Sequence, residues 1–175
     1  FVRDLILNRE RNDLDILVIG SGTDFAKSVA DELGITNVSY FKNFGTAHFD
    51  FWEMNIEFVG ARKESYDHNT RKPIVEDGTF EEDISRRDFT INTLAISLNI
   101  NEIGKLIDKF DGLSDIKNQL IKTPLDPFNT FDDDPLRIMR AFRFASQLNF
   151  YIDESIMIAS KEMRERLAIV SQERI

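Results

Sequence analysis

Two aspartates one residue apart, Asp13 and Asp15, are the first side chains in this sequence whose type and spacing could do chemistry. They open an apolar run that favours a β-strand. Because strand side chains alternate between two faces, both carboxylates should point the same way, about 6–7 Å apart. Oxygen ligands at that spacing can hold a hard divalent cation, but the spacing does not identify the metal. A solvated strand end is the alternative interpretation.

Glu57 would bring a third carboxylate to the same place. It lies between Ile56 and Phe58 in another strand-like segment. If these two neighbours face the core, the glutamate faces the opposite side of the sheet. Three carboxylates on adjacent strands suit a two-metal phosphoryl-transfer site, in which one ion activates an attacking 3′-hydroxyl and the other stabilises the leaving pyrophosphate. An exposed strand glutamate without a role is the alternative.

A glycine-rich segment, Gly20-Ser21-Gly22-Thr23, follows the strand that carries the aspartates and precedes a predicted helix, which Thr23 or Asp24 should cap. Backbone N–H groups and a helix N-terminus at such a place can bind phosphate. The spacing is not that of a dinucleotide fingerprint, which needs three glycines. A tight turn explains the segment equally well.

Residues 86–95, with the sequence RRDFTINTLA, lie in a segment that we expect to be helical from about residue 81 to residue 98. On a helix, Asp88 and Asn92 are four residues apart and share a face. That face could bind a ribose hydroxyl while Arg87 contacts phosphate. Solvated surface arginines are the alternative.

Asp134 and Arg137 stand three residues apart in a second polar cluster. Pro135 suits the first position of a helix with Asp134 as its N-cap, and Arg140 and Arg143 would continue the same row. The Asp134 carboxylate is an acceptor and the Arg137 guanidinium is a donor. Such a pair complements cytosine and adenine, which each present an amino donor next to a ring-nitrogen acceptor, whereas guanine and uracil present the donor and the acceptor in the opposite order. A simple cap, followed by arginines that suit the helix dipole, is the alternative.

The elements that must position these groups indicate an α/β fold followed by an all-helical segment. The polar stretch at residues 63–80 is expected to be a functional or a disordered loop, mobile without substrate. We place a boundary near Thr130, between a domain at residues 1–130 and a helical one at residues 131–175. The expected strands span residues 14–19, 38–44, 47–52 and 54–59, and residues 103–110 are expected to form a last strand or a hairpin. The expected helices, besides that at 81–98, span residues 2–6, 25–33, 112–120, 135–148 and 154–170.

The composition limits the functional classes. Of 175 residues, 42% are hydrophobic, which favours a packed globular chain over a disordered one. No apolar run approaches the roughly 20 residues of a membrane span, and the absence of cysteine excludes disulfides and is compatible with a cytoplasmic protein. Two histidines, His48 and His68, are too few for a His-rich zinc site, and we expect neither to be catalytic. The net charge of −9 is the wrong sign for broad capture of a nucleic acid.

In this order, the segments resemble the class II CCA-adding tRNA nucleotidyltransferases and the similar bacterial poly(A) polymerases, within the polymerase-β-like nucleotidyltransferase superfamily. The resemblance runs from Phe1 to about Leu148. It places Asp13 and Asp15 on the family's metal-binding aspartates and Glu57 on the third carboxylate position, so these three are the implied catalytic residues.

Other motifs of the family are also matched. Residues 86–95 are similar to its ribose-recognition motif, although Thr93 stands where alanine is usual, and Asp111-Gly112 matches a hinge-like motif. Residues 133–137 resemble its amino-acid template for base selection, with Asp133 where glutamate is usual. The residues implied to bind the nucleotide are Arg3, Arg87, Asp88, Asn92, Asp134, Arg137, Arg140 and Arg143.

The resemblance implies a nucleotidyltransferase head followed by a helical neck. Its expected reaction is metal-dependent, template-independent transfer of CMP and AMP from CTP and ATP to the 3′ end of tRNA, with release of pyrophosphate and with Mg²⁺ as cofactor. We expect an N-terminal catalytic fragment, because the body and tail that hold tRNA in the family lie outside these residues. A poly(A) polymerase, an A-adding enzyme of the same family and a non-catalytic nucleotide- or RNA-binding module are the alternatives. The oligomeric state stays open.

Overall fold

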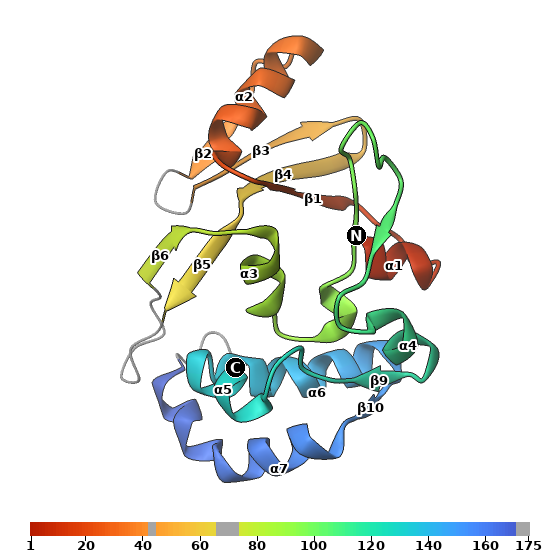
Figure 1. Ribbon diagram of the computed structural model, residues 1–175, viewed down its shortest axis with the longest axis vertical. Coiled ribbons are helices and arrows are strands. Elements are labelled where there is room, and N and C mark those ends of the chain that lie inside the picture. Colours follow the sequence, from red (N-terminus) through yellow and green to blue (C-terminus); the bar gives the residue numbers. More distant parts are fainter. Residues whose placement is uncertain (42–44, 66–73, 171–175) are drawn as a thin grey trace. The chain divides into compact units, whose positions relative to one another are not determined.

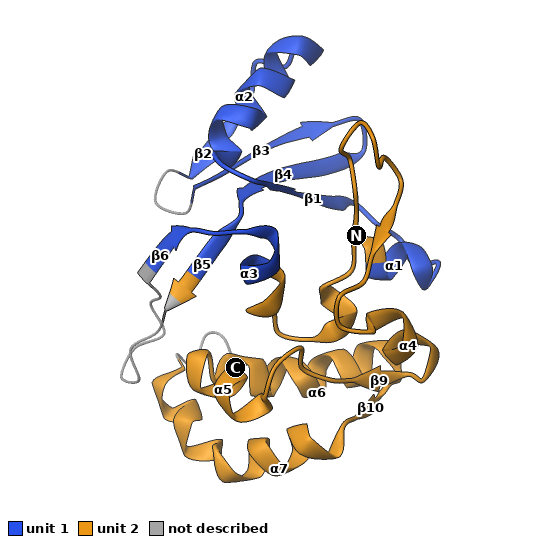
Figure 2. Ribbon diagram, in the orientation of Figure 1, with its two compact units in different colours: residues 1, 3–63, 75–83 blue, residues 2, 64–74, 84–175 orange. Residues whose placement is uncertain are grey.

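The computed structural model describes residues 1–41, 45–65 and 74–170. It has helices and strands in mixed order, which confirms the predicted α/β class (Figure 1). The chain divides into two compact units (Figure 2). The first contains residues 3–63 and 75–83, and the second contains residues 64–74 and 84–175.

The first unit is built on a four-stranded sheet with strand order β1-β4-β3-β2. The central strand β4 is parallel to β1 and antiparallel to β3. A short helix, α1, precedes β1, and a longer one, α2, connects β1 to β2. The bounds are α1 Val2–Ile6, β1 Asp13–Val18, α2 Gly22–Leu33, β2 Ser39–Phe41, β3 Thr46–Phe51 and β4 Met54–Gly60.

One face of this sheet packs against α2, and the other remains available for polar side chains. Small residues of the helix let it approach the sheet, where two aromatic rings fill the space; the buried cluster is Ala26, Ala30, Ala47, Phe49 and Phe58. The helix ends where the sequence predicts, because Gly34 adopts the left-handed conformation (φ 69°) that ends helices. Its N-cap is Ser21 rather than the predicted Thr23 or Asp24, since the Asp24 N–H donates to Ser21 Oγ at 3.2 Å.

The turn between β1 and α2 lies directly against the end of β4. A Cβ on Gly22 would lie 2.7 Å from Gly60 N and 2.9 Å from Val59 C, which are backbone atoms that cannot easily move away. A Cβ on Gly60 would in turn meet Gly20 O at 2.8 Å. The glycines are therefore required by close backbone approach, which supports the tight-turn interpretation of this segment.

The predicted loop at residues 63–80 is partly regular. β5 (Arg62–Ser65) pairs with β6 (Ile74–Asp77), and α3 (Phe80–Ser85) begins shortly afterwards. The charged strands show no apolar alternation, so the sequence pattern misses them. The mobility predicted for residues 63–80 stays a prediction, and residues 66–73 of this stretch lie outside the described residues.

The predicted helix at residues 81–98 is wrong beyond its first turns. α3 ends at Ser85, a 3₁₀ turn follows at Thr90–Asn92 (η2), and Ala95–Ile96 is a short strand, β7. The backbone leaves the helical path because Thr90 N–H donates to Lys122 O, 2.8 Å away and 32 residues on in the chain, rather than to its own turn. The β-branched residues of this segment favour that outcome.

The remainder of the second unit is mostly helical. It contains a hairpin of β7 with β8 (Leu106–Ile107), in which β8 lies in the predicted strand or hairpin and β7 lies in the predicted helix. It also contains the helices α4 (Gly112–Lys117), α6 (Leu136–Leu148) and α7 (Glu154–Glu162), and the 3₁₀ segment η3 (Arg164–Ile169) follows α7. The sequence did not predict helix α5 (Pro127–Asp133) or the parallel pair of β9 (Leu120–Ile121) with β10 (Tyr151–Ile152). Asp126 begins α5 by accepting from Phe128 N–H and Asn129 N–H.

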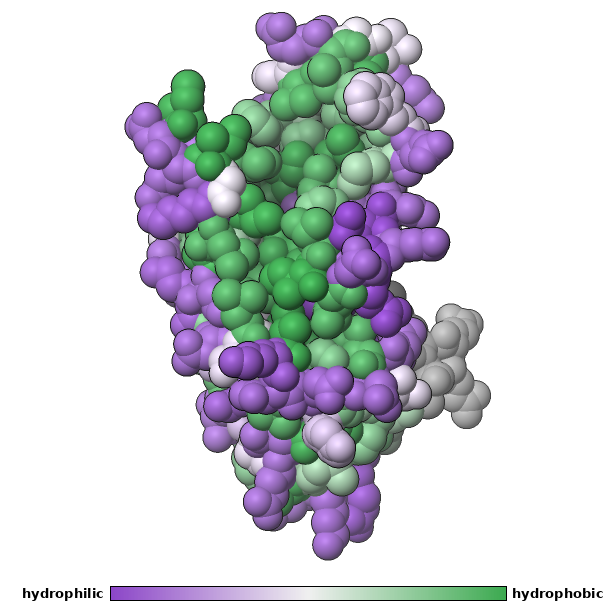
Figure 3. Space-filling model, turned by 90° about the vertical axis from the view of Figure 1, so that its right-hand side faces the viewer, coloured by the Kyte–Doolittle hydropathy of each residue, from purple (hydrophilic) through white to green (hydrophobic). Residues whose placement is uncertain are grey.

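The compact units do not follow the predicted boundary near Thr130, since residues 84–130 group with the helices that follow. We placed that boundary where the sequence changes to an all-helical pattern, and it stays a prediction. Within the described ranges, no helix is both long enough and apolar enough to cross a membrane. Large apolar side chains are nevertheless exposed, Trp52, Ile100 and Tyr151 most of all, and Figure 3 shows apolar residues at the surface among polar ones.

Candidate active site

The three predicted carboxylates lie together on the face of the sheet that α2 leaves open. The strand register pairs Asp15 with Glu57, and Asp13 with Asn55, on the parallel strands β1 and β4. Paired residues of adjacent strands point to the same face. Asp13 and Asp15 are exposed, whereas Leu14 between them is half-buried, as the alternation predicts.

His48 belongs to the same row of side chains. It pairs with Glu57 across β3 and β4, so the row runs from Asp15 through Glu57 to His48. The imidazole also packs on the Phe41 ring, with 5.3 Å between the ring centroids. Sequence reasoning treated this residue as a strand histidine without a catalytic role. The signal that places it here is the register of the β3–β4 hairpin, with its two-residue turn.

The row concentrates negative charge. Partial burial raises the pKa of Glu57, and the nearby Asp15 carboxylate raises it further, while His48 and Arg62 act in the opposite direction. Such a row favours a bound cation, because the cation would offset the repulsion between the carboxylates. Among the described residues, no three Asp, Glu, His or Cys side chains converge on one metal position. An ion held by Asp13 and Asp15 would therefore complete its coordination with water or substrate oxygens, as Mg²⁺ usually does.

The raised pKa of Glu57 leads to a stability prediction. The ionised group opposes folding at neutral pH, and this effect disappears as the pH falls toward its ordinary pKa of 4.5. We expect Glu57→Gln to increase the free energy of unfolding of the metal-free protein at pH 7 by about 0.2–1 kcal/mol, the scale of exposed charge interactions. The gain should shrink as the pH is lowered to 4.5. Denaturant unfolding at both pH values measures it.

The control for this prediction is Glu53→Gln. Glu53 is an exposed residue in the turn between β3 and β4, so the substitution makes the same charge change away from the row. A stability gain of equal size in both variants, or a loss at pH 7 for Glu57→Gln, would contradict the predicted cost of the ionised Glu57 carboxylate.

Asp88, in the second unit, is the centre of a polar network. Its Oδ2 accepts from Arg140 Nε at 2.8 Å and from Arg140 Nη2 at 2.6 Å. Its Oδ1 accepts from Phe89 N–H at 2.8 Å and from Asn92 Nδ2 at 2.9 Å. The predicted proximity of Asp88 and Asn92 is therefore correct, although the predicted reason, a shared helix face, is wrong. The four hydrogen bonds that this buried carboxylate accepts fix Asn92 and Arg140 relative to each other.

The arginines beside Asp88 have different partners. Arg87 Nη1 donates to Asn92 O at 3.4 Å. Arg86 forms an ion pair of 3.0 Å with Glu64, whose side chain is only 3% exposed. A buried carboxylate must be paired, so Arg86 has a structural role that the sequence did not indicate.

Asp134 and Arg137 lie at the junction of α5 and α6. The structure makes Pro135 the N-cap of α6, so the predicted assignment of Asp134 as N-cap with Pro135 at the first position is wrong by one residue. Asp134 still supports the helix start, because its Oδ1 accepts from Leu136 N–H at 3.1 Å. Arg137 is buried and donates from Nη1 to Thr130 O at 3.3 Å.

The carboxyl group next to this pair is partly buried as well. Burial raises the pKa of Asp133, and the neighbouring Asp132 acts in the same direction, whereas Arg137 lowers it. Asp133 is the residue that the resemblance places where glutamate is usual.

Arg140 and Arg143, the last two arginines of the predicted row, are more exposed than Arg137. Arg140 and Arg143 both lie over the Phe144 ring, at 5.3 Å and 5.2 Å from its centroid. Arg143 is exposed, whereas Arg137 is buried. In the first unit, Arg3 donates to both carboxylate oxygens of its neighbour Asp4, at 3.1 Å and 2.7 Å.

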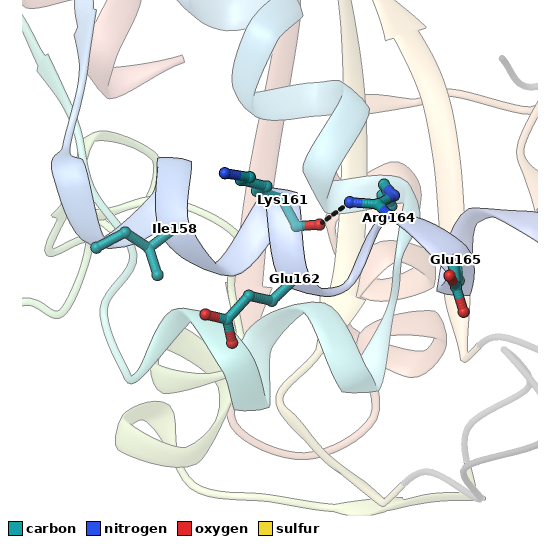
Figure 4. Close-up of a pocket in the computed structure, with 5 residues that line it drawn as sticks. All are labelled: Ile158, Lys161, Glu162, Arg164 and Glu165. Atoms are coloured by element: carbon teal, nitrogen blue, oxygen red, sulfur yellow. Dashed lines mark hydrogen bonds between the residues drawn. The ribbon is translucent and has the colours of Figure 1, made fainter.

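A surface depression lies elsewhere, on α7 and η3. Its lining residues are Ile158, Lys161, Glu162, Arg164 and Glu165 (Figure 4). None of them is a predicted site residue. The side chains come from an exposed helix surface, so the depression adds nothing to the site described above.

Comparison with known proteins supports the resemblance seen in the sequence. Residues 1–122 match the poly A polymerase head domain family. The A-adding tRNA nucleotidyltransferase of Aquifex aeolicus is 45% identical over 154 residues, which are 88% of this chain and 18% of that protein. The CCA-adding enzyme of Lactobacillus helveticus is 37% identical over 99% of this chain and 42% of its own length.

A solved structure agrees with these relatives. A tRNA nucleotidyltransferase, complexed with a primer tRNA and an incoming ATP analogue, superimposes with a TM-score of 0.81 and 40% identity, over 95% of this chain and 45% of that one. The chain thus spans less than half the length of these relatives. The match over most of its residues shows that it belongs to the poly A polymerase head domain family.

Proposed function

We propose that the protein transfers CMP and AMP from CTP and ATP to the 3′ end of tRNA and releases pyrophosphate. The observation that carries this proposal is the register of β1 and β4, which sets Asp15 beside Glu57 and Asp13 one row away on the open face of the sheet. The relatives support the substrate class, because they are named as CCA-adding and A-adding enzymes.

In this proposal Asp13 and Asp15 hold Mg²⁺, and Glu57 is the third catalytic carboxylate. The bound ion would supply charge stabilisation for phosphoryl transfer and lower the pKa of the attacking 3′-hydroxyl. Oxygen ligands on exposed strand positions fit a hard cation that keeps several waters or substrate oxygens. The proposal keeps the predicted cytoplasmic location.

The second unit supplies the nucleotide contacts of the proposal. Asn92 and Arg140, which Asp88 fixes, would bind the ribose and phosphates together with Arg87. Asp134 and Arg137 would select the base, one as acceptor and the other as donor. Arg3 and Arg143 complete the residues assigned to the nucleotide and its surroundings.

A second candidate is addition of A alone, which the relative from Aquifex aeolicus favours by its name. The two candidates differ in the first nucleotide that they add. We expect the full-length protein to incorporate CTP onto a tRNA that lacks its last three nucleotides, and ATP onto a tRNA that lacks only the terminal A. Incorporation of ATP alone would favour the A-adding function. Absence of any metal-dependent release of pyrophosphate would favour a non-catalytic binding module.

A further inference from the structure

The junction of α5 and α6 carries both residues that the proposed function assigns to base selection. α5 ends at Asp133, Asp134 has an extended backbone (φ −145°, ψ 100°), and α6 begins at Leu136 (Figure 1). The carbonyls in the last turn of a helix have no partner inside the helix. The groups that bond these carbonyls therefore help to set where Asp134 and Arg137 lie.

Two arginines bond carbonyls in this last turn. Arg137 donates to Thr130 O, as described above. Arg166 Nη2 donates to the main-chain oxygen of Asp132 at 2.5 Å and lies 3.1 Å from the carboxylate oxygen Oδ1 of the same residue. Arg166 comes from η3, 34 residues further along the chain, and its side chain is only 15% exposed. A distant segment thus holds the residue two positions before Asp134.

The contact between Arg166 and Asp132 can fix the position of the backbone at Asp132. A guanidinium group is planar and donates in fixed directions, so one group that contacts both the main chain and the side chain of Asp132 restrains direction as well as distance. The Asp132 carboxylate is 43% exposed, and an ion pair with such an exposed partner adds little stability. The bond to the main-chain oxygen is the part that fixes the backbone.

We propose that Arg166 is a positioning residue for base selection, acting through Asp132 on the segment that carries Asp134 and Arg137. The inference rests on the proposed function. Recognition of a base requires donors and acceptors held to within about 0.5 Å. A loosened junction should therefore lower the selectivity among bases while the fold is retained.

The test compares Arg166→Met with Arg164→Met in the full-length protein. Arg164 is the matched control, because it lies in the same 3₁₀ segment, is exposed, and donates to Lys161 O (Figure 4). We measure kcat/KM for single incorporation of each of the four NTPs, together with melting temperatures. Arg166→Met should lower the ratio of kcat/KM for ATP to kcat/KM for UTP or GTP roughly tenfold, and Arg164→Met should leave this ratio unchanged.

Two further variants keep the test decisive if Arg166→Met folds poorly. Arg166→Lys retains a charged donor and should recover part of the selectivity. Asp132→Asn retains the main-chain oxygen, so it should lower the selectivity less than Arg166→Met does. In the double variant, the two losses of selectivity should not add. Unchanged selectivity in Arg166→Met, or in Arg166→Lys where Arg166→Met does not fold, with only a lower melting temperature, would overturn the inference. A wild-type protein that fails to distinguish the four NTPs would instead refute the proposed function itself.

Discussion

Replacing either aspartate of β1 with asparagine should abolish nucleotide transfer while the protein stays folded. Asp13 and Asp15 are exposed, so Asp13→Asn and Asp15→Asn change neither packing nor shape. A bound metal ion supplies several kcal/mol of transition-state stabilisation, and its loss corresponds to a decrease of about 10³-fold or more in kcat. Single-turnover incorporation of ATP, measured over a range of Mg²⁺ concentrations, gives the size of the effect.

A matched control separates the loss of a ligand from the loss of a charge. Asp31→Asn removes one exposed carboxylate from α2 in the same unit and should leave turnover unchanged. The melting temperatures of all three variants should stay close to that of the wild type, because surface substitutions of this kind usually change stability by less than about 0.5 kcal/mol. Turnover within about tenfold of the wild type in Asp13→Asn or Asp15→Asn would exclude the catalytic role.

Substitution of the base-selecting pair should change which nucleotide is used more than how fast it is used. In the proposed function, Asp134 accepts from the amino group of C or A, and Arg137 donates to the adjacent ring acceptor. A wrong base would leave buried polar groups unpaired at about 1–3 kcal/mol for each mismatch. Two such contacts give a selectivity of a few hundred-fold, which Asp134→Ala and Arg137→Ala should each reduce. Incorporation of all four NTPs measures the ratio.

Stability needs its own control here, because Arg137 is buried and donates to Thr130 O. Ile138→Ala removes a buried apolar side chain from the neighbouring position of α6 and should cost about 2–5 kcal/mol without touching the base. If Arg137→Ala melts earlier but rejects UTP and GTP as strongly as Ile138→Ala does, the pair has only a structural role.

The sequence alone determined the parts of the site that depend on local alternation. Asp13 and Asp15 share a face because they lie two residues apart on a strand. Alternation also turns Glu57 away from the core, because its apolar neighbours face the core. Its position beside Asp15, however, depends on the pairing of β1 with β4, which is a tertiary contact. The helix that follows β1 is equally local, since Gly34 is the residue type that a left-handed C-cap favours. Helical periodicity likewise located α6 and α7 without knowledge of their partners.

The tertiary structure decided what depends on contacts between distant residues. The residues after Ser85 carry an apolar pattern that suits a helix, yet Thr90 bonds to Lys122 and the helix does not form. The partners of Asp88, Asp132 and Glu64 are arginines 52, 34 and 22 residues further along the chain. No local pattern encodes such pairs, because a carboxylate does not specify where in the sequence its charged partner lies, even when burial requires one, as for Asp88 and Glu64.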